Sequence, residues 1–121
     1  MADAATTVGE LKDAVRQFAA ERNWEPYHSP KNLVMALAVE VAELMEPMMW
    51  VGPRASRRLV NDQAQRDALA DELADVAILV LNLSLSLGLD LSDAIREKMA
   101  KNAIKYPPGQ VGGNWPTDSH E

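Results

Sequence analysis

Cysteine is absent from this chain of 121 residues, so disulfides, thiolate zinc sites and cysteine nucleophiles are excluded. Histidine is scarce, because His28 and His120 are the only two, and they are too few for an imidazole-rich metal site. Basic residues are outnumbered by acidic ones, 12 to 18, which gives a net charge of -6. Surfaces that bind polyanions normally carry a basic excess, so we expect no binding to a nucleic acid polymer.

A long hydrophobic run is also missing. The longest, from 76 to 87, is interrupted by Asn82, Ser84 and Ser86 and is shorter than the roughly 20 residues of a membrane span. The start MADAATTVGEL has neither a basic nor an apolar leader segment, so we expect no secretory signal and no membrane contact. The default expectation is a cytoplasmic protein.

The chain has the length of one domain, and apolar residues recur with the helical period of 3.6 without a convincing alternating strand. This pattern predicts an all-α fold, a four-helix bundle in residues 1–107, followed by a weakly ordered tail, 108–121, rich in Gly, Pro and polar residues. Pro47 is expected to kink or end the second helix, and 51–62 reads as a basic, flexible connection. The predicted helices are 8–23, 30–49, 63–87 and 91–104.

The third predicted helix is apolar on every face between 76 and 87, which is typical of a helix surrounded by protein. A small bundle rarely covers one of its helices completely, so we expect a second subunit on it, in a homodimer or a dimer of dimers (a homotetramer). The alternative is a monomer in which Asn82, Ser84 and Ser86 supply enough polar surface.

Acidic residues interrupt the apolar second and third helices at matching intervals. Glu40 and Glu43 are spaced i,i+3, as are Glu72 and Asp75, so each pair lies on one helical face. Glu46 falls about 120° further around its helix and is set apart. If the two helices pack antiparallel, the pairs can face one another, and their mutual repulsion then requires a cation between them.

Oxygen-only ligands favour hard ions, Mg²⁺ first and Mn²⁺ second. Position 43 is Glu and position 75 is Asp, where di-iron bundles place histidines, which counts against iron. The alternative is that both acidic pairs lie on ordinary solvated faces. The repetition of the spacing on consecutive apolar helices favours the metal site.

Four blocks of the chain resemble a known family. The motifs E-x-x-E at Glu40 and E-x-x-D at Glu72 resemble those of the MazG-like all-α nucleotide pyrophosphohydrolases, and the similarity extends over about residues 8–107. It points to the dCTP pyrophosphatase branch. The blocks that carry it are FAAERNWEPYHSPKNLVMAL (18–37), EVAEL followed by Trp50, DELADV, and KMAKNAIKYP (98–107).

The resemblance implies that the protein converts a nucleoside triphosphate to the monophosphate and pyrophosphate, with dCTP or a modified cytosine nucleotide as the first substrate to consider. The ions would be held by the four catalytic and metal-binding carboxylates, Glu40, Glu43, Glu72 and Asp75. The family's aromatic base pocket is matched by Trp24 and Trp50, and a further linker position by His28. Phosphate and nucleotide contacts are matched by Lys98, Asn102, Lys105 and Tyr106, which share one face of the last helix.

The chain departs from its relatives at several positions. Val39 stands where MazG proteins often have a first glutamate, and Val15 and Leu79 align with a pocket histidine and tyrosine of the vertebrate dCTP pyrophosphatases. These departures leave the base preference open. Two other functions also stay open: a non-catalytic helical module for dimerisation or interaction, and hydrolysis of a different phosphoanhydride such as a nucleotide-sugar.

Overall fold

The computed structural model describes residues 1–109, and all regular structure within them is helical, which confirms the predicted all-α class. The predicted tail lies outside the described residues from Gln110 onward. Residues 1–109 contain five α-helices, the first four of which are connected through short 3₁₀ turns. They are α1 (Val8–Glu21), α2 (Pro30–Met45), α3 (Pro53–Arg58), α4 (Gln63–Leu87) and α5 (Leu91–Lys105).

Local side-chain chemistry fixes where the long helices begin. The N-cap residues Thr7, Ser29, Asp62 and Asp90 each accept a hydrogen bond from the backbone N–H three residues further on. Such caps satisfy backbone donors that have no partner inside the helix. At the end of α4, Gly88 has a φ of 65°, the left-handed conformation that glycine adopts without a steric cost.

Two helices end earlier than the sequence predicts. The second helix stops at Met45 rather than at 49, and a 3₁₀ turn, Glu46–Met48, follows it. Pro47 explains this end, because its ring would clash with the carbonyl of the preceding turn. The first helix stops at Glu21 rather than at 23, since Asn23 has a φ of 55° and cannot continue a right-handed helix.

The basic connection 51–62 is not the flexible loop that its composition indicates. It contains α3 and the 3₁₀ turn Leu59–Asn61. Pro53 occupies the first helical position, where its fixed φ suits the helix and its missing N–H costs nothing. The Ser56 hydroxyl donates to the Pro53 carbonyl at 2.6 Å and closes this short helix.

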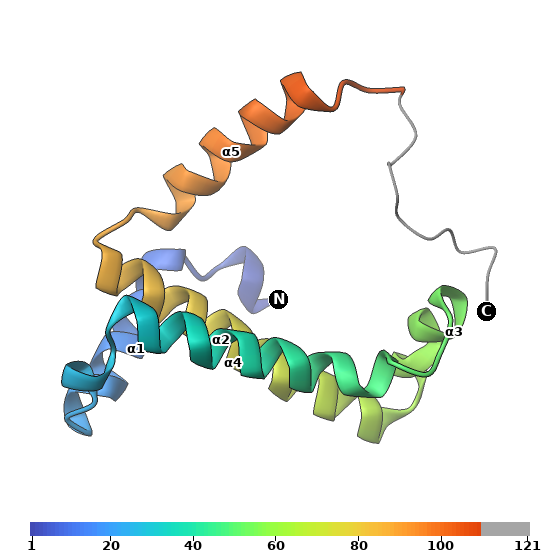
Figure 1. The fold of residues 1–121 in the computed structure, drawn as a ribbon, viewed down its shortest axis with the longest axis horizontal. Coiled ribbons are helices and arrows are strands. Elements are labelled where there is room, and N and C mark those ends of the chain that lie inside the picture. Colours follow the sequence, from blue (N-terminus) through green and yellow to red (C-terminus); the bar gives the residue numbers. More distant parts are fainter. Residues whose placement is uncertain (110–121) are drawn as a thin grey trace.

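Helices α2 and α4 lie side by side and antiparallel, and α1 packs against α4 (Figure 1). The apolar core of the single chain is small, with Ala19, Leu33 and Leu81 as its buried members among the described residues. In this part of the chain no single helix is long and apolar enough to cross a membrane. Taken together, α4 and α5 have the length and apolar composition of a membrane span, but they are bent by 100° at the break between them.

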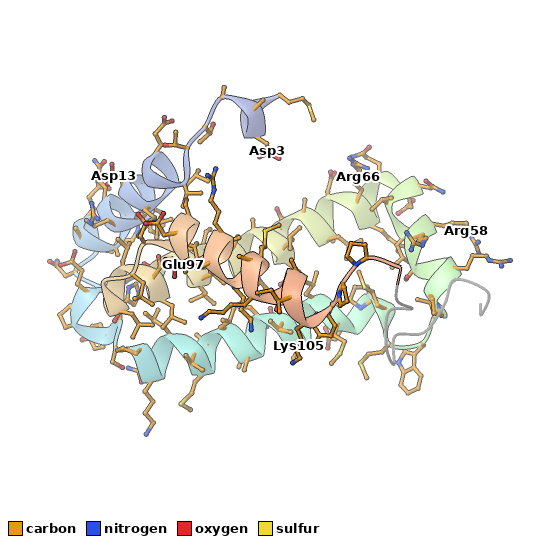
Figure 2. The ribbon with its side chains drawn as sticks, turned by 90° about the horizontal axis from the view of Figure 1, so that it is seen from above. Asp3, Asp13, Arg58, Arg66, Glu97 and Lys105 are labelled. Carbon is orange, nitrogen blue, oxygen red and sulfur yellow. The ribbon has the colours of Figure 1, made fainter. Side chains whose placement is uncertain are left out.

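Helix α5 stands away from the other long helices (Figure 1), so one chain alone does not complete the predicted four-helix bundle. The sharp bend after α4 is held by Lys12, which donates from Nζ to the Leu89 carbonyl at 2.9 Å. Seen from above, side chains project from α5 along its whole length, including Glu97 and Lys105 (Figure 2). Ile95, Met99 and Ile104 on this helix are exposed.

Candidate active site between α1, α2 and α4

Three carboxylates from α2 and α4 converge. Glu40, Glu43 and Glu72 each place one oxygen within 4.8 Å of the others. The antiparallel packing of α2 on α4 brings the two E-x-x-acid faces together, as their i,i+3 spacing predicts. Glu46 does not join this cluster.

Two oxygens of the cluster have no donor. Glu40 Oε2 and Glu72 Oε2 are buried and accept no hydrogen bond from any described residue. Burial raises the pKa of Glu40, and the negative charge of Glu43 raises it further. The pKa of Glu72 is raised by the same two causes in the same order. Without a metal, Glu40 and Glu72 therefore bind protons more readily than ordinary glutamates do. A cation in the cluster would relieve the same repulsion between the carboxylates.

The donor set fits a hard divalent cation. The cluster offers carboxylate oxygens and no sulfur or imidazole, the choice that Mg²⁺ and Mn²⁺ prefer over softer metals. A cation placed among the three residues would also supply the partner that the buried oxygens of Glu40 and Glu72 lack. Glu40, Glu43 and Glu72 are therefore the residues that would hold the metal.

Asp75 lies beside this cluster rather than within it. Its oxygens are not among the mutually close set, yet its charge raises the pKa of both Glu40 and Glu72. It lines the adjoining pocket together with Glu40. Three of the four predicted ligands thus converge, and the fourth faces the place where a ligand would approach them.

A pocket of about 470 Å³ opens next to the carboxylates, within the range of small-molecule sites. The ring of Trp24 contacts Phe18 edge-on at 5.6 Å and His28 at 6.4 Å between centroids. The wall is mainly apolar, with the acidic groups at one end. It is lined by Ala14, Val15, Phe18, Ala19, Trp24, His28, Ala36, Glu40, Asp75, Ile78, Leu79 and Asn82.

Several predicted contacts are not brought to this pocket by the same chain. Trp50 follows the 3₁₀ turn after α2 and is 90% exposed. The predicted nucleotide contacts of the last helix lie on or just beyond α5, which stands away from α1, α2 and α4 (Figure 1). Those residues are Lys98, Asn102, Lys105 and Tyr106.

The pocket also contains residues whose importance the sequence only partly indicates. Val15 and Leu79, noted in the sequence as departures from the family that it resembles, line it. Asn82 lines it too, although in the sequence it reads only as an interruption of an apolar run. The missed signal is its spacing of seven residues from Asp75, which places both on one face of α4.

Comparison with known proteins identifies the family to which this chain belongs. A model described as the MazG-like family matches residues 35–113. The dCTP pyrophosphatase 1 proteins of Mus musculus and Homo sapiens are each 37% identical over 101 residues, covering 84% of this chain and 59% of each relative. The chain belongs to the MazG-like family.

A solved structure with a similar sequence has a similar fold. The crystal structure of a pyrophosphatase from Archaeoglobus fulgidus has a TM-score of 0.74 and 36% identity, covering 82% of this chain and 91% of that chain. These findings confirm the resemblance to the dCTP pyrophosphatase branch. This MazG-like chain spans 59% of the length of its mouse and human relatives.

Proposed function

We propose that the protein is a Mg²⁺-dependent nucleoside triphosphate pyrophosphohydrolase that releases the monophosphate and pyrophosphate. The observation that carries the proposal is the convergence of Glu40, Glu43 and Glu72 beside a pocket of nucleotide size. The pyrophosphatase names of its relatives in mouse, human and Archaeoglobus fulgidus support the same reaction class. A cytoplasmic location stays a prediction from the sequence.

The residues divide the work according to their positions. Glu40, Glu43 and Glu72 would hold the metal, which supplies charge neutralisation for the triphosphate and activation of the attacking water. Asp75 faces the pocket and is placed to hydrogen-bond that water or to accept its proton. Trp24 presents a half-exposed indole at the pocket wall, where base stacking contributes about 1–3 kcal/mol.

A cytosine deoxynucleotide is the first substrate to test, because the relatives are described as dCTP pyrophosphatases. The carboxylate end of the pocket suits a metal-bound triphosphate, and its apolar end suits a base. In the resemblance drawn from the sequence, Val15 and Leu79 take the places of a histidine and a tyrosine, and both line the pocket here.

The test is pyrophosphate release from dCTP with and without Mg²⁺. Glu43→Gln removes a ligand charge and Asp75→Asn removes the acceptor in the pocket, and each should lower the rate by roughly 100-fold or more, since even groups behind a metal ligand cost 10–100-fold. Glu46→Gln is the matched control from the end of the same helix, outside the cluster, and should retain the rate.

A thermal-shift measurement checks the same residues without turnover. Mg²⁺ should raise the melting temperature of the unmutated protein and of Glu46→Gln, and much less that of Glu43→Gln. Equal turnover in Glu43→Gln and in the unmutated protein would overturn the proposed role of the cluster. Absence of both turnover and a metal shift would favour the non-catalytic interaction module.

The active form that we propose is a homodimer or a dimer of such dimers. Among the described residues the buried apolar core is limited to Ala19, Leu33 and Leu81, whereas large apolar side chains on α2, α4 and α5 stay exposed. A second copy packed on these side chains would bury them, as the apolar interfaces of obligate homodimers do.

A second copy would also complete the site. Lys98 and Asn102, which the resemblance matches to nucleotide contacts, lie on α5, and α5 stands away from α1, α2 and α4 of its own chain (Figure 1). An exchange of α5 between two copies would cover its exposed Ile95 and Met99 and bring cationic and amide groups to the triphosphate.

A further inference from the structure

Asn82 is one of two buried polar residues among residues 1–109, and it is the one without a partner. Its side chain is 9% exposed, and Ser84, the other, is 5% exposed. The Ser84 hydroxyl donates to the Leu81 carbonyl at 2.7 Å. No described residue forms a hydrogen bond with the Asn82 amide. Its amide atoms are not among the fully buried unpartnered side-chain atoms of residues 1–109, so a ligand or water can still reach and satisfy them.

The position of Asn82 lets a ligand in the pocket beside the carboxylates reach it. It lines the pocket together with Asp75, Ile78 and Leu79, at spacings of three, four and seven residues from Asp75 on α4. Seven residues of helix span about 10.5 Å. This length is comparable with that from the α-phosphate to the far edge of a nucleoside's base, with Ile78 and Leu79 between the two ends.

The chemistry of the amide matches the edge of a pyrimidine. Asparagine presents one carbonyl acceptor and one NH₂ donor side by side. Cytosine offers a 4-amino donor next to the N3 acceptor, and uracil or thymine offers the O4 acceptor next to the N3–H donor. A half-turn of the amide exchanges one pattern for the other, and no described residue holds the amide of Asn82 in one orientation.

We propose that Asn82 is the specificity-determining residue that hydrogen-bonds the Watson–Crick edge of the base, and that it accepts cytosine and uracil or thymine alike. The enzyme is then a pyrimidine triphosphate pyrophosphohydrolase rather than one restricted to cytosine. This inference rests on the proposed function, because it uses the same pocket. The apolar side chains of Val15 and Leu79 add no further polar group that would separate the two base types.

The first experiment compares dCTP, dUTP and the deoxynucleoside triphosphate of pyrimidin-2-one, which lacks a substituent at position 4. In the unmutated protein kcat/KM for dCTP and dUTP should agree within about tenfold. Asn82→Leu should lower both by roughly 5- to 150-fold, the effect of one bidentate amide–base pair, mainly through KM. For the pyrimidin-2-one substrate, the decrease in kcat/KM caused by Asn82→Leu should be several-fold smaller, because one of the two hydrogen bonds to the base is already missing.

Ser84→Ala is the matched control, since Ser84 is a buried polar residue of the same helix with a partner inside the protein. It should leave the ratios between substrates unchanged. Asn82→Ser keeps a polar group in the pocket with less volume and should reproduce the direction of the Asn82→Leu effect. An equal loss for all three substrates, or unchanged ratios in both Asn82 variants, would overturn the proposal. A preference of the unmutated protein for dCTP over dUTP above about 100-fold would overturn the shared recognition of both bases.

A binding measurement separates this inference from the proposed reaction. Calorimetric titration of dCMP and dUMP requires no hydrolysis, and Asn82→Leu should weaken both monophosphates relative to Ser84→Ala. If the protein hydrolyses no triphosphate, the proposed reaction fails while the binding contrast still tests Asn82. If turnover is present and the contrast is absent, the role of Asn82 fails alone.

Discussion

Glu40 and Glu72 each keep one carboxylate oxygen out of water with no hydrogen-bond donor, so they are unfavourable for the metal-free fold. Burial and the charge of Glu43 raise their pKa values. A group with a raised pKa holds its proton in the folded state at pH values where the unfolded chain has lost it. The stability of the folded state that depends on this proton is therefore lost as pH rises through the raised pKa.

Glu40→Gln removes this pH dependence at one position. In metal-free buffer the variant should unfold at a higher temperature than the unmutated protein, and the difference should grow as pH rises above 4.5, the ordinary glutamate pKa, and through the raised pKa of Glu40. Thermal unfolding followed by circular dichroism measures it. Glu46→Gln, outside the cluster, should show no such growth. A difference for Glu40→Gln that is constant or shrinks with rising pH contradicts the raised pKa.

Single residues differ in how far the sequence reveals them. The carboxylates could be predicted because the repeated i,i+3 spacing fixes a helical face wherever the helices pack. The convergence of three rather than four depends on the relative rotation of α2 and α4, which no local pattern specifies. The sequence could not identify Asn82 as a pocket residue, because an amide within an apolar run can equally well face solvent. Only its burial in the structure decides between the two.

At the scale of elements, the ends of the helices are set by local chemistry. The bounds of α4 agree with the predicted 63–87 because Asp62 caps its start and Gly88 its end. The helix α3 was missed because the composition of 51–62 resembles a loop, although Pro53 is well placed to begin a short helix. Charge and composition are weaker guides than capping residues at these boundaries.

Two glycine substitutions test this local control in opposite directions. Gly88→Ala forces a side chain into a φ of 65° and should lower the free energy of unfolding by about 1 kcal/mol. Gly9→Ala lies in α1, where the added Cβ would be 3.8 Å from the Thr7 hydroxyl, an ordinary contact. It should stabilise the protein by about 0.5–1 kcal/mol. Urea denaturation measures both, and a stabilising Gly88→Ala would contradict the role of this turn.

At the scale of the whole molecule, the described part of the chain is built around a small core and leaves large apolar side chains exposed on all four long helices. Val34, Met35 and Val39 project from α2, Leu73 from α4 and Ile104 from α5, where it is 85% exposed. The sequence indicated an additional subunit through the all-round apolar character of the third helix. It could not indicate that α5 departs at 100°, because that angle is set at the turn after α4, where Lys12 donates a hydrogen bond to the Leu89 carbonyl.

Mixing two defective chains tests whether α5 acts on a neighbouring copy. Glu43→Gln damages the cluster on α2, and Asn102→Ala removes the predicted contact on α5. If each site combines α2 and α4 of one chain with α5 of its partner, a mixed dimer contains one site with both defects and one intact site. Random exchange of subunits should then restore about one quarter of the unmutated rate.

Glu43→Gln mixed with Glu40→Gln is the control, because both changes fall in the same cluster and cannot be separated by exchanging α5. That mixture should stay inactive in every combination. The mass of the complex, measured by light scattering during size-exclusion chromatography, gives the number of chains independently. If the protein is a stable dimer and neither mixture regains activity, α5 contributes to the site of its own chain. In that case the bend after Gly88 would have to change when nucleotide binds, so that α5 closes over the pocket.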